Sequence, residues 1–487
     1  MTTPDHHEPT TETDVPRLRV WAGRFLIVSL APTATFGSRF VGNIIMSRML
    51  APYEFGTAIA ITVVLGLGGL VTDMALDRFV IINNSMRALS TAHMLSIVIN
   101  VTLALALFVA APAIAAMFGV ANFATSFALA AGLSVVAGFA HLGIKQIQRN
   151  YEYGPDAVAQ VAMQLASLAA LFLAATILRN HRAIIFGTTV GLVVYVILSH
   201  VLARMPYRIS WDKPTLHQAL SFGLPLTLNG IALAIMYQLD RVLVGYWFGV
   251  KELATYTLIF SLSVVPTNLL ISIFFGPTFS YLLSGSQDAS DRSKRYRLLL
   301  GFYSILTSLY AFWIVLTLDI ITPLIFGRSF TVSPLAHVLL TLIACLRFQR
   351  AGVPTAFLLA SRRTKQLAFL NLLSGFGLII AFGCIIFWPR LESMLIGIAI
   401  GEFLSFTIFF ALSEEAIRRG MVVVDLTIAI VVPAVMVVAL AWNPVSTWQA
   451  RGILFIIGLV AISAQLTFEF RRNKKFGELL FKLGFSR

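Results

Sequence analysis

The residues with the clearest chemical potential in this chain are arginines inside long apolar segments. A helix is expected between Arg24 and Arg48, and Arg39 lies about 22 Å along it. At 100° per residue, Arg39 shares a polar face with Asn43, and a charge at that depth must face a partner or a wet cavity. Arg39 therefore either binds an anion or pairs with a carboxylate of a neighbouring helix. Arg48 joins the same candidate site only if the helix bends.

A second pair of arginines lies in the apolar segment expected over residues 335–360. Arg347 and Arg350 are three residues apart and share one helix face, where two like charges repel each other in a low dielectric. A guanidinium binds phosphate oxygens bidentately, so a pyrophosphate-type ligand is one natural partner. The alternative partner is Glu402, which lies in the middle of another apolar segment.

The middle of the chain holds an interrupted apolar helix. The run GLPLTLNG at Gly223–Gly230 contains a proline, two glycines and Asn229, and such interruptions favour a transporter's binding site. Asp240 and Arg241 follow. Arg241 is a candidate ligand, and the alternative is an ion pair between Asp240 and Arg241 at the membrane interface.

Two acids inside apolar segments, Asp73 and Glu402, are candidates for coupling transport to an ion, although pairing with the buried arginines is the alternative for both. His141, His200 and His337 are interpreted as isolated packing or interfacial residues. The sequence has no phosphate loop of the GxxxxGK[ST] type and no metal motif. We therefore expect no catalytic residue, no metal and no cofactor.

The overall composition indicates in which class of protein these residues lie. Hydrophobic residues make up 58% of the 487, charged residues only 12%, and the mean hydropathy is +0.85. A soluble protein has about 25% charged residues, so the chain is expected in a membrane. The formal charge of +14 would suggest a nucleic-acid partner in a soluble protein. Here the basic residues lie in short loops between the apolar segments, a pattern that indicates membrane topology and contact with anionic lipid. We therefore expect no nucleic-acid partner.

The apolar segments predict an all-α polytopic protein with about fourteen transmembrane helices. They cover residues 24–47, 57–80, 92–118, 123–143, 157–178, 183–203, 217–247, 254–283, 298–318, 335–360, 367–388, 393–412, 424–442 and 449–469. Loops assigned to the cytoplasm hold about 25 of the 36 Lys and Arg residues, so both termini are predicted to be cytoplasmic and the protein to span the inner membrane.

The predicted organisation is two six-helix bundles and a terminal helix pair. It comprises a disordered cytoplasmic tail (1–16), an N-terminal six-helix bundle (17–204), a cytoplasmic linker (205–216), a C-terminal six-helix bundle (217–420), two further helices (421–470) and a basic cytoplasmic tail (471–487). The two bundles begin with similar stretches, Ser38–Ala58 and Leu239–Leu258, each with an arginine before a turn. This is typical of a parallel repeat, although chance similarity of helix–turn–helix segments is the alternative.

Three stretches resemble a known family. RFVGNIIMSRMLAPYEFG (Arg39–Gly56) is similar to the opening helix and turn of bacterial polysaccharide exporters and O-antigen flippases, of the multidrug/oligosaccharidyl-lipid/polysaccharide transporter superfamily. SFGLPLTLNG (Ser221–Gly230) and QLDRVLVGYWFGVKELATYTLIFSL (Gln238–Leu262) resemble the start of the second half. The resemblance implies two bundles around a central cavity that flip an undecaprenyl-diphosphate-linked oligosaccharide.

The resemblance also implies roles and partners. Arg39, Arg48 and Arg241 would be cationic cavity residues, and the last two helices would flank the cavity. The implied partners are the lipid-linked oligosaccharide and polymerases or glycosyltransferases of the same pathway. A multidrug or cation antiporter of the same fold is the main alternative. A membrane-embedded polysaccharide polymerase, ligase or glycosyltransferase is a further one, but it normally needs a large periplasmic loop or an acidic metal motif.

Overall fold

The structure is a computed structural model that describes residues 14–72, 74–150, 152–283, 289–330, 333–361 and 363–412, together with residues 463 and 467. Every regular element in these ranges is a helix. The first half contains α1 (Asp14–Met49), α2 (Pro52–Thr72), α3 (Leu76–Ile82), α4 (Met86–Met117), α5 (Ala124–Gly138), α6 (Gly143–Gln146), α7 (Gly154–Leu178) and α8 (Arg182–Leu202). The second half contains α9 (Lys213–Ser263), α10 (Val265–Leu283), α11 (Ala289–Phe326), α12 (Pro334–Ala351), α13 (Val353–Ala360), α14 (Thr364–Phe387) and α15 (Leu391–Leu412).

Ten segments of the described chain are long and apolar enough to cross a membrane. One of them, Gln238–Leu283, is 46 residues long and runs through two expected spans, and the expected span 24–47 lies within α1. The chain is therefore a multi-pass helical membrane protein, as the composition predicts. The expected spans 424–442 and 449–469, like Asp73, fall outside the described ranges apart from residues 463 and 467. The count of fourteen stays a prediction.

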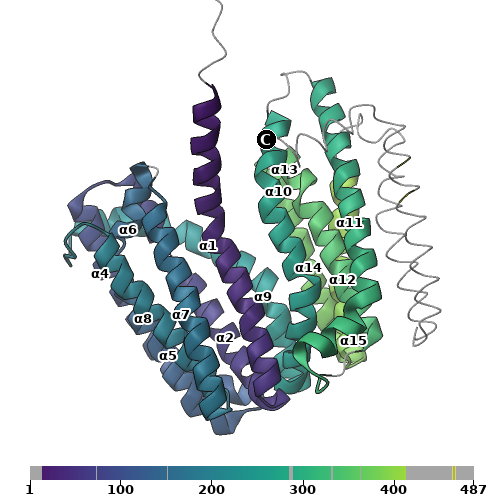
Figure 1. Ribbon diagram of the computed structural model, residues 1–487, viewed down its shortest axis with the longest axis horizontal. Coiled ribbons are helices and arrows are strands. Elements are labelled where there is room, and N and C mark those ends of the chain that lie inside the picture. Colours follow the sequence, from purple (N-terminus) through teal and green to yellow (C-terminus); the bar gives the residue numbers. More distant parts are fainter. Residues whose placement is uncertain are drawn as a thin grey trace, which may run out of the picture.

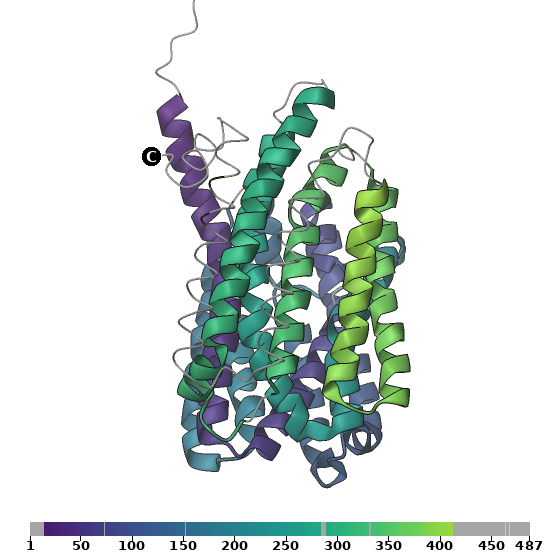
Figure 2. The same ribbon diagram turned by 90° about the vertical axis from the view of Figure 1, so that its right-hand side faces the viewer.

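The helices form two bundles (Figure 1). Helices α2 and α4 to α8 lie on one side of the molecule, α10 to α15 lie on the other, and α1 and α9 run between them. The helices of both bundles run roughly along one common direction (Figure 2). This arrangement lets every backbone polar group of a span bond within its own helix, as the hydrocarbon core demands.

Helix α9 connects the two bundles. It begins after Asp212, whose carboxylate accepts a hydrogen bond from the Thr215 backbone N–H at 3.1 Å. Its first turns pack against the first bundle, where the Phe222 ring lies 6.2 Å from that of Phe79. The helix bends at Gly249, whose backbone has a φ of 82°. Only glycine adopts that conformation readily, so Gly249 makes the turn that the two repeat-like stretches predict.

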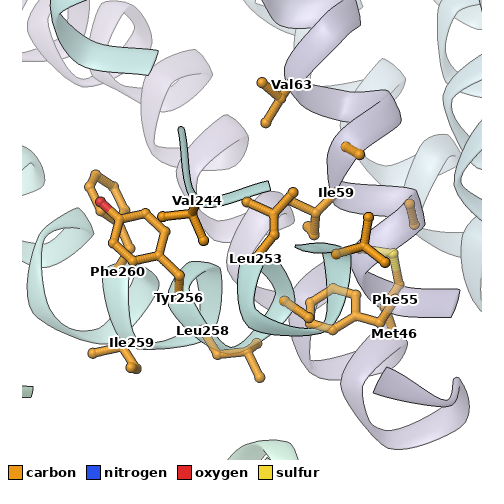
Figure 3. Close-up of a cluster of buried hydrophobic side chains, with 14 of the residues drawn as sticks. Met46, Phe55, Ile59, Val63, Val244, Leu253, Tyr256, Leu258, Ile259 and Phe260 are labelled. Carbon is orange, nitrogen blue, oxygen red and sulfur yellow. The ribbon is translucent and has the colours of Figure 1, made fainter. Parts of the chain in front are cut away.

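The two bundles meet at one end of the molecule. There Met46 of α1 and Phe55 of α2 lie close to Leu253 and Leu258 of α9 in one buried apolar cluster (Figure 3). A Cβ atom on Gly56 would lie only 1.8 Å from the carbonyl oxygen of Val250, so the helices approach more closely than any larger side chain allows. We call this the closed end, and the opposite end, where α1 begins, the open end.

Candidate functional site

Arg39 of α1 marks the place where the interior changes from packed to open. Its side chain is exposed, whereas Asn43 and Met46, one and two turns further on the same helix face, are 9% and 3% exposed. The interior face of α1 is therefore packed from Asn43 toward the closed end and accessible at Arg39. Within the described chain, no side chain forms a hydrogen bond or ion pair with the Arg39 guanidinium.

Arg241 of α9 lies close enough to Arg39 for the two charges to repel each other. Its guanidinium donates to the Gln238 Oε1 at 2.5 Å and lies 4.4 Å from the centre of the Phe260 ring. These partners are neutral. The two arginines occupy corresponding positions of the repeat-like stretches, about 15 Å and 12 Å from the turns at which α1 and this part of α9 end.

The ion pair between the side chains of Asp240 and Arg241, which the sequence left open as an alternative, is not among the ion pairs of the described residues. The Asp240 carboxylate instead accepts the Tyr256 hydroxyl at 2.5 Å and the Arg241 backbone N–H at 2.9 Å. Neighbouring residues of a helix point about 100° apart, so the two side chains face different surroundings. Tyr256, which is fully buried, is a site residue that the sequence analysis missed because an aromatic residue in an apolar helix carries no signal of its own.

Arg347, Arg350 and Glu402 form a buried charge cluster. Arg347 Nε donates to Glu402 Oε1 at 2.7 Å, and Arg350 Nε lies 3.3 Å from Glu402 Oε2. Arg350 also donates to the Asn371 Oδ1 at 2.9 Å. The alternative that the sequence left open, a carboxylate partner for the two arginines, is the arrangement found. Arg347 also attracts Asp240, so this cluster reaches the Arg241 region.

Two other candidate residues join the bundles near the closed end. The Asn43 amide donates to the Ser261 hydroxyl at 2.9 Å. The Arg48 guanidinium donates to the backbone carbonyls of Ile325, at 2.8 Å, and Leu324, at the end of α11. Asn229 lies within α9, and its side chain is not among those described.

The interpretation of the histidines as isolated is wrong for His141 and His200. Their rings lie 5.2 Å apart and surround Tyr207 together with His93. His141 donates from Nε2 to the Met205 carbonyl at 3.1 Å, so the cluster holds the connection between α8 and α9 against the first bundle. Burial lowers the pKa of His141 from its ordinary value. The three histidines are more than 40 positions apart, so no sequence pattern reveals such a cluster.

Comparison with known proteins places this geometry in a wider context. A family model described as "Polysaccharide biosynthesis protein" matches residues 45–334. The succinoglycan biosynthesis transport protein ExoT of Rhizobium meliloti is 24% identical over 301 residues. That match covers 58% of this chain and 57% of the relative, so the chain spans a little over half the length of that relative.

Two solved structures share the fold. The lipid II flippase MurJ in an inward closed conformation has a TM-score of 0.68 at 12% identity, over 91% of this chain and 99% of that one. An inward-facing multidrug resistance MATE family transporter of the MOP superfamily has a TM-score of 0.60 at 14% identity, over 80% of this chain and 96% of the other. The family resemblance inferred from the three quoted stretches is confirmed.

Proposed function

Since the chain belongs to the polysaccharide biosynthesis protein family, we propose that this membrane transporter flips an undecaprenyl-diphosphate-linked oligosaccharide across the inner membrane by alternating access. Arginines of the interior would hold the diphosphate. The relative named as a succinoglycan biosynthesis transport protein supports a polysaccharide precursor as cargo. The similarity to a lipid II flippase supports a fold that suits such a step.

The observation that carries the proposal is the exposed Arg39 beside Arg241. Two guanidiniums that repel each other, with no described carboxylate paired to either, favour binding of a compensating anion between the bundles. A diphosphate carries several negative charges and offers pairs of oxygens that match the guanidinium fork. A cationic drug would meet repulsion at the same place, which disfavours the antiporter alternative.

The Arg347–Glu402–Arg350 cluster would act at longer range. Its two guanidiniums share the Glu402 carboxylate and add positive charge close to Arg241, which would attract an anion toward Arg241. Glu402 is held by both arginines and is a poor candidate for binding a coupling ion.

Arg48 and Asn43 would reach the lipid-linked substrate only after their bonds between the bundles break, when the closed end opens.

The direction of transport follows from the predicted topology. With cytoplasmic termini, the open end faces the cytoplasm, and the diphosphate reaches Arg39 from the inner leaflet. The closed end then opens toward the periplasm. Glycosyltransferases of the same pathway would supply the cargo, and a polymerase would consume it. The basic loops would contact anionic lipid.

Flipping by purified protein in liposomes tests the proposal. The cargo is the lipid-linked oligosaccharide that accumulates in cells lacking the protein. We expect Arg39→Ala to abolish its movement and Arg39→Lys to keep part of it, because lysine preserves the charge and loses the fork. Arg182→Ala changes an exposed arginine at the start of α8 and serves as the control. Full activity of Arg39→Ala, or a wild-type protein that moves cations and not this lipid, would overturn the proposal.

A further inference from the structure

Helix α7 has two contrasting faces. Val158 and Leu165, seven residues apart, are 57% and 62% exposed and mark the face toward lipid. On the opposite face, at four-residue spacing, stand Asp156, Gln160 and Gln164. Three polar side chains in a row along one face of a membrane-spanning helix must point into the protein, because the apolar surroundings penalise unsatisfied amides.

These side chains continue into the polar face of α1. Gln160 Nε2 donates to the Asp156 carboxylate at 2.8 Å, and Gln164 Nε2 donates to the Thr35 hydroxyl at 3.3 Å. Thr35 lies one turn before Arg39 on α1. We call Asp156, Gln160, Gln164 and Thr35 the polar ladder, and it runs on α7 for about 12 Å from the open end toward the arginines.

The ladder has hydrogen-bonding capacity to spare. A glutamine amide has two donor hydrogens and an acceptor oxygen, and in the described chain Gln160 and Gln164 each make one hydrogen bond. Both side chains are only half-buried, so their remaining polar atoms are accessible. Asp156 differs: it is 5% exposed and also accepts from Lys145 Nζ at 2.7 Å, which anchors the ladder at its outer end.

We propose that the polar ladder binds the sugar next to the diphosphate, with Gln160 and Gln164 as the residues that recognise its hydroxyl groups. Neutral amides that both donate and accept suit sugar hydroxyls, which also do both. A diphosphate, which only accepts, is better served by the arginines. The inference rests on the proposed function, because it assumes that the diphosphate lies at Arg39.

Binding of two lipids to the intact protein in nanodiscs separates the sugar from the diphosphate. One probe is undecaprenyl diphosphate, and the other is the lipid-linked oligosaccharide that accumulates in cells lacking the protein. We expect Gln160→Leu/Gln164→Leu to weaken binding of the sugar-bearing lipid by about 30-fold and to leave undecaprenyl diphosphate unaffected. Arg39→Ala should weaken binding of both lipids.

The controls keep the test decisive. Gln218→Leu makes the same change at an exposed position of α9 and should affect neither lipid. Gln160→Leu alone leaves the Gln164–Thr35 bond between α7 and α1 intact and should still weaken binding of the sugar-bearing lipid. Equal weakening of both lipids, or unchanged binding of both, overturns the ladder while leaving the proposed function standing. A wild-type protein that binds neither lipid overturns both.

Discussion

Replacing Glu402 by glutamine removes the only negative charge that contacts both Arg347 and Arg350 in the described chain. Glutamine keeps an oxygen that can accept from Arg347, but it turns an NH₂ group toward Arg350. Breaking a buried ion pair by neutralising one partner costs about 3–5 kcal/mol, since the remaining charge stays buried without compensation. Here two guanidiniums lose the carboxylate that they share, so we expect the upper part of that range.

The measurement is thermal unfolding of the purified protein in nanodiscs, together with gradient-driven flipping. Glu402→Gln should lower Tm by about 5 °C. Removing one of the two neighbouring positive charges, in Glu402→Gln/Arg350→Gln, should restore part of the loss. Glu392→Gln changes a half-buried acid at the start of the same helix and should leave Tm within a degree or so of the wild type.

One result would refute this reasoning. If Glu402→Gln unfolds like the wild type and binds the lipid-linked cargo, yet no longer responds to an ion gradient, then Glu402 couples transport to an ion. The structural explanation through the two arginines would then be wrong.

Three further predictions follow from other parts of the molecule. Gly56→Ala should abolish flipping, because its Cβ prevents the closed end from packing, whereas Gly37→Ala, where a Cβ meets nothing within 4 Å, should flip normally. Burial lowers the pKa of His141 from its ordinary value of 6.5, so the unfolded chain binds more protons than the folded one, and stability should fall as pH drops below about 6.5. The difference in Tm between pH 7.5 and pH 5 should therefore be smaller in His141→Gln than in the wild type. Reporter fusions should place Asn122 in the periplasm and Arg363 in the cytoplasm, and the reverse result would invert the proposed direction of transport.

The helices and the membrane class were readable from the sequence. A bilayer demands about twenty apolar residues per span and bonds every backbone group within its helix, so each span is a local property of the chain. Arg39 could be singled out for the same reason, because its depth depends only on its distance along its own helix. The repeat-like stretches likewise predicted the turn that Gly249 makes in α9.

Which side chains meet was decided only by the tertiary structure. The sequence named Glu402 as a candidate partner for Arg347, 55 residues away, but left open whether Arg347 binds an anionic ligand instead. Nothing in the sequence predicted the hydrogen bond from Gln164 to Thr35 or the one from Tyr256 to Asp240. Such pairings depend on the rotation and tilt of each helix. In a membrane, close packing of side chains sets these angles, because lipid and protein interior are both apolar. A polar face such as that of α7 shows only which side of a helix points inward.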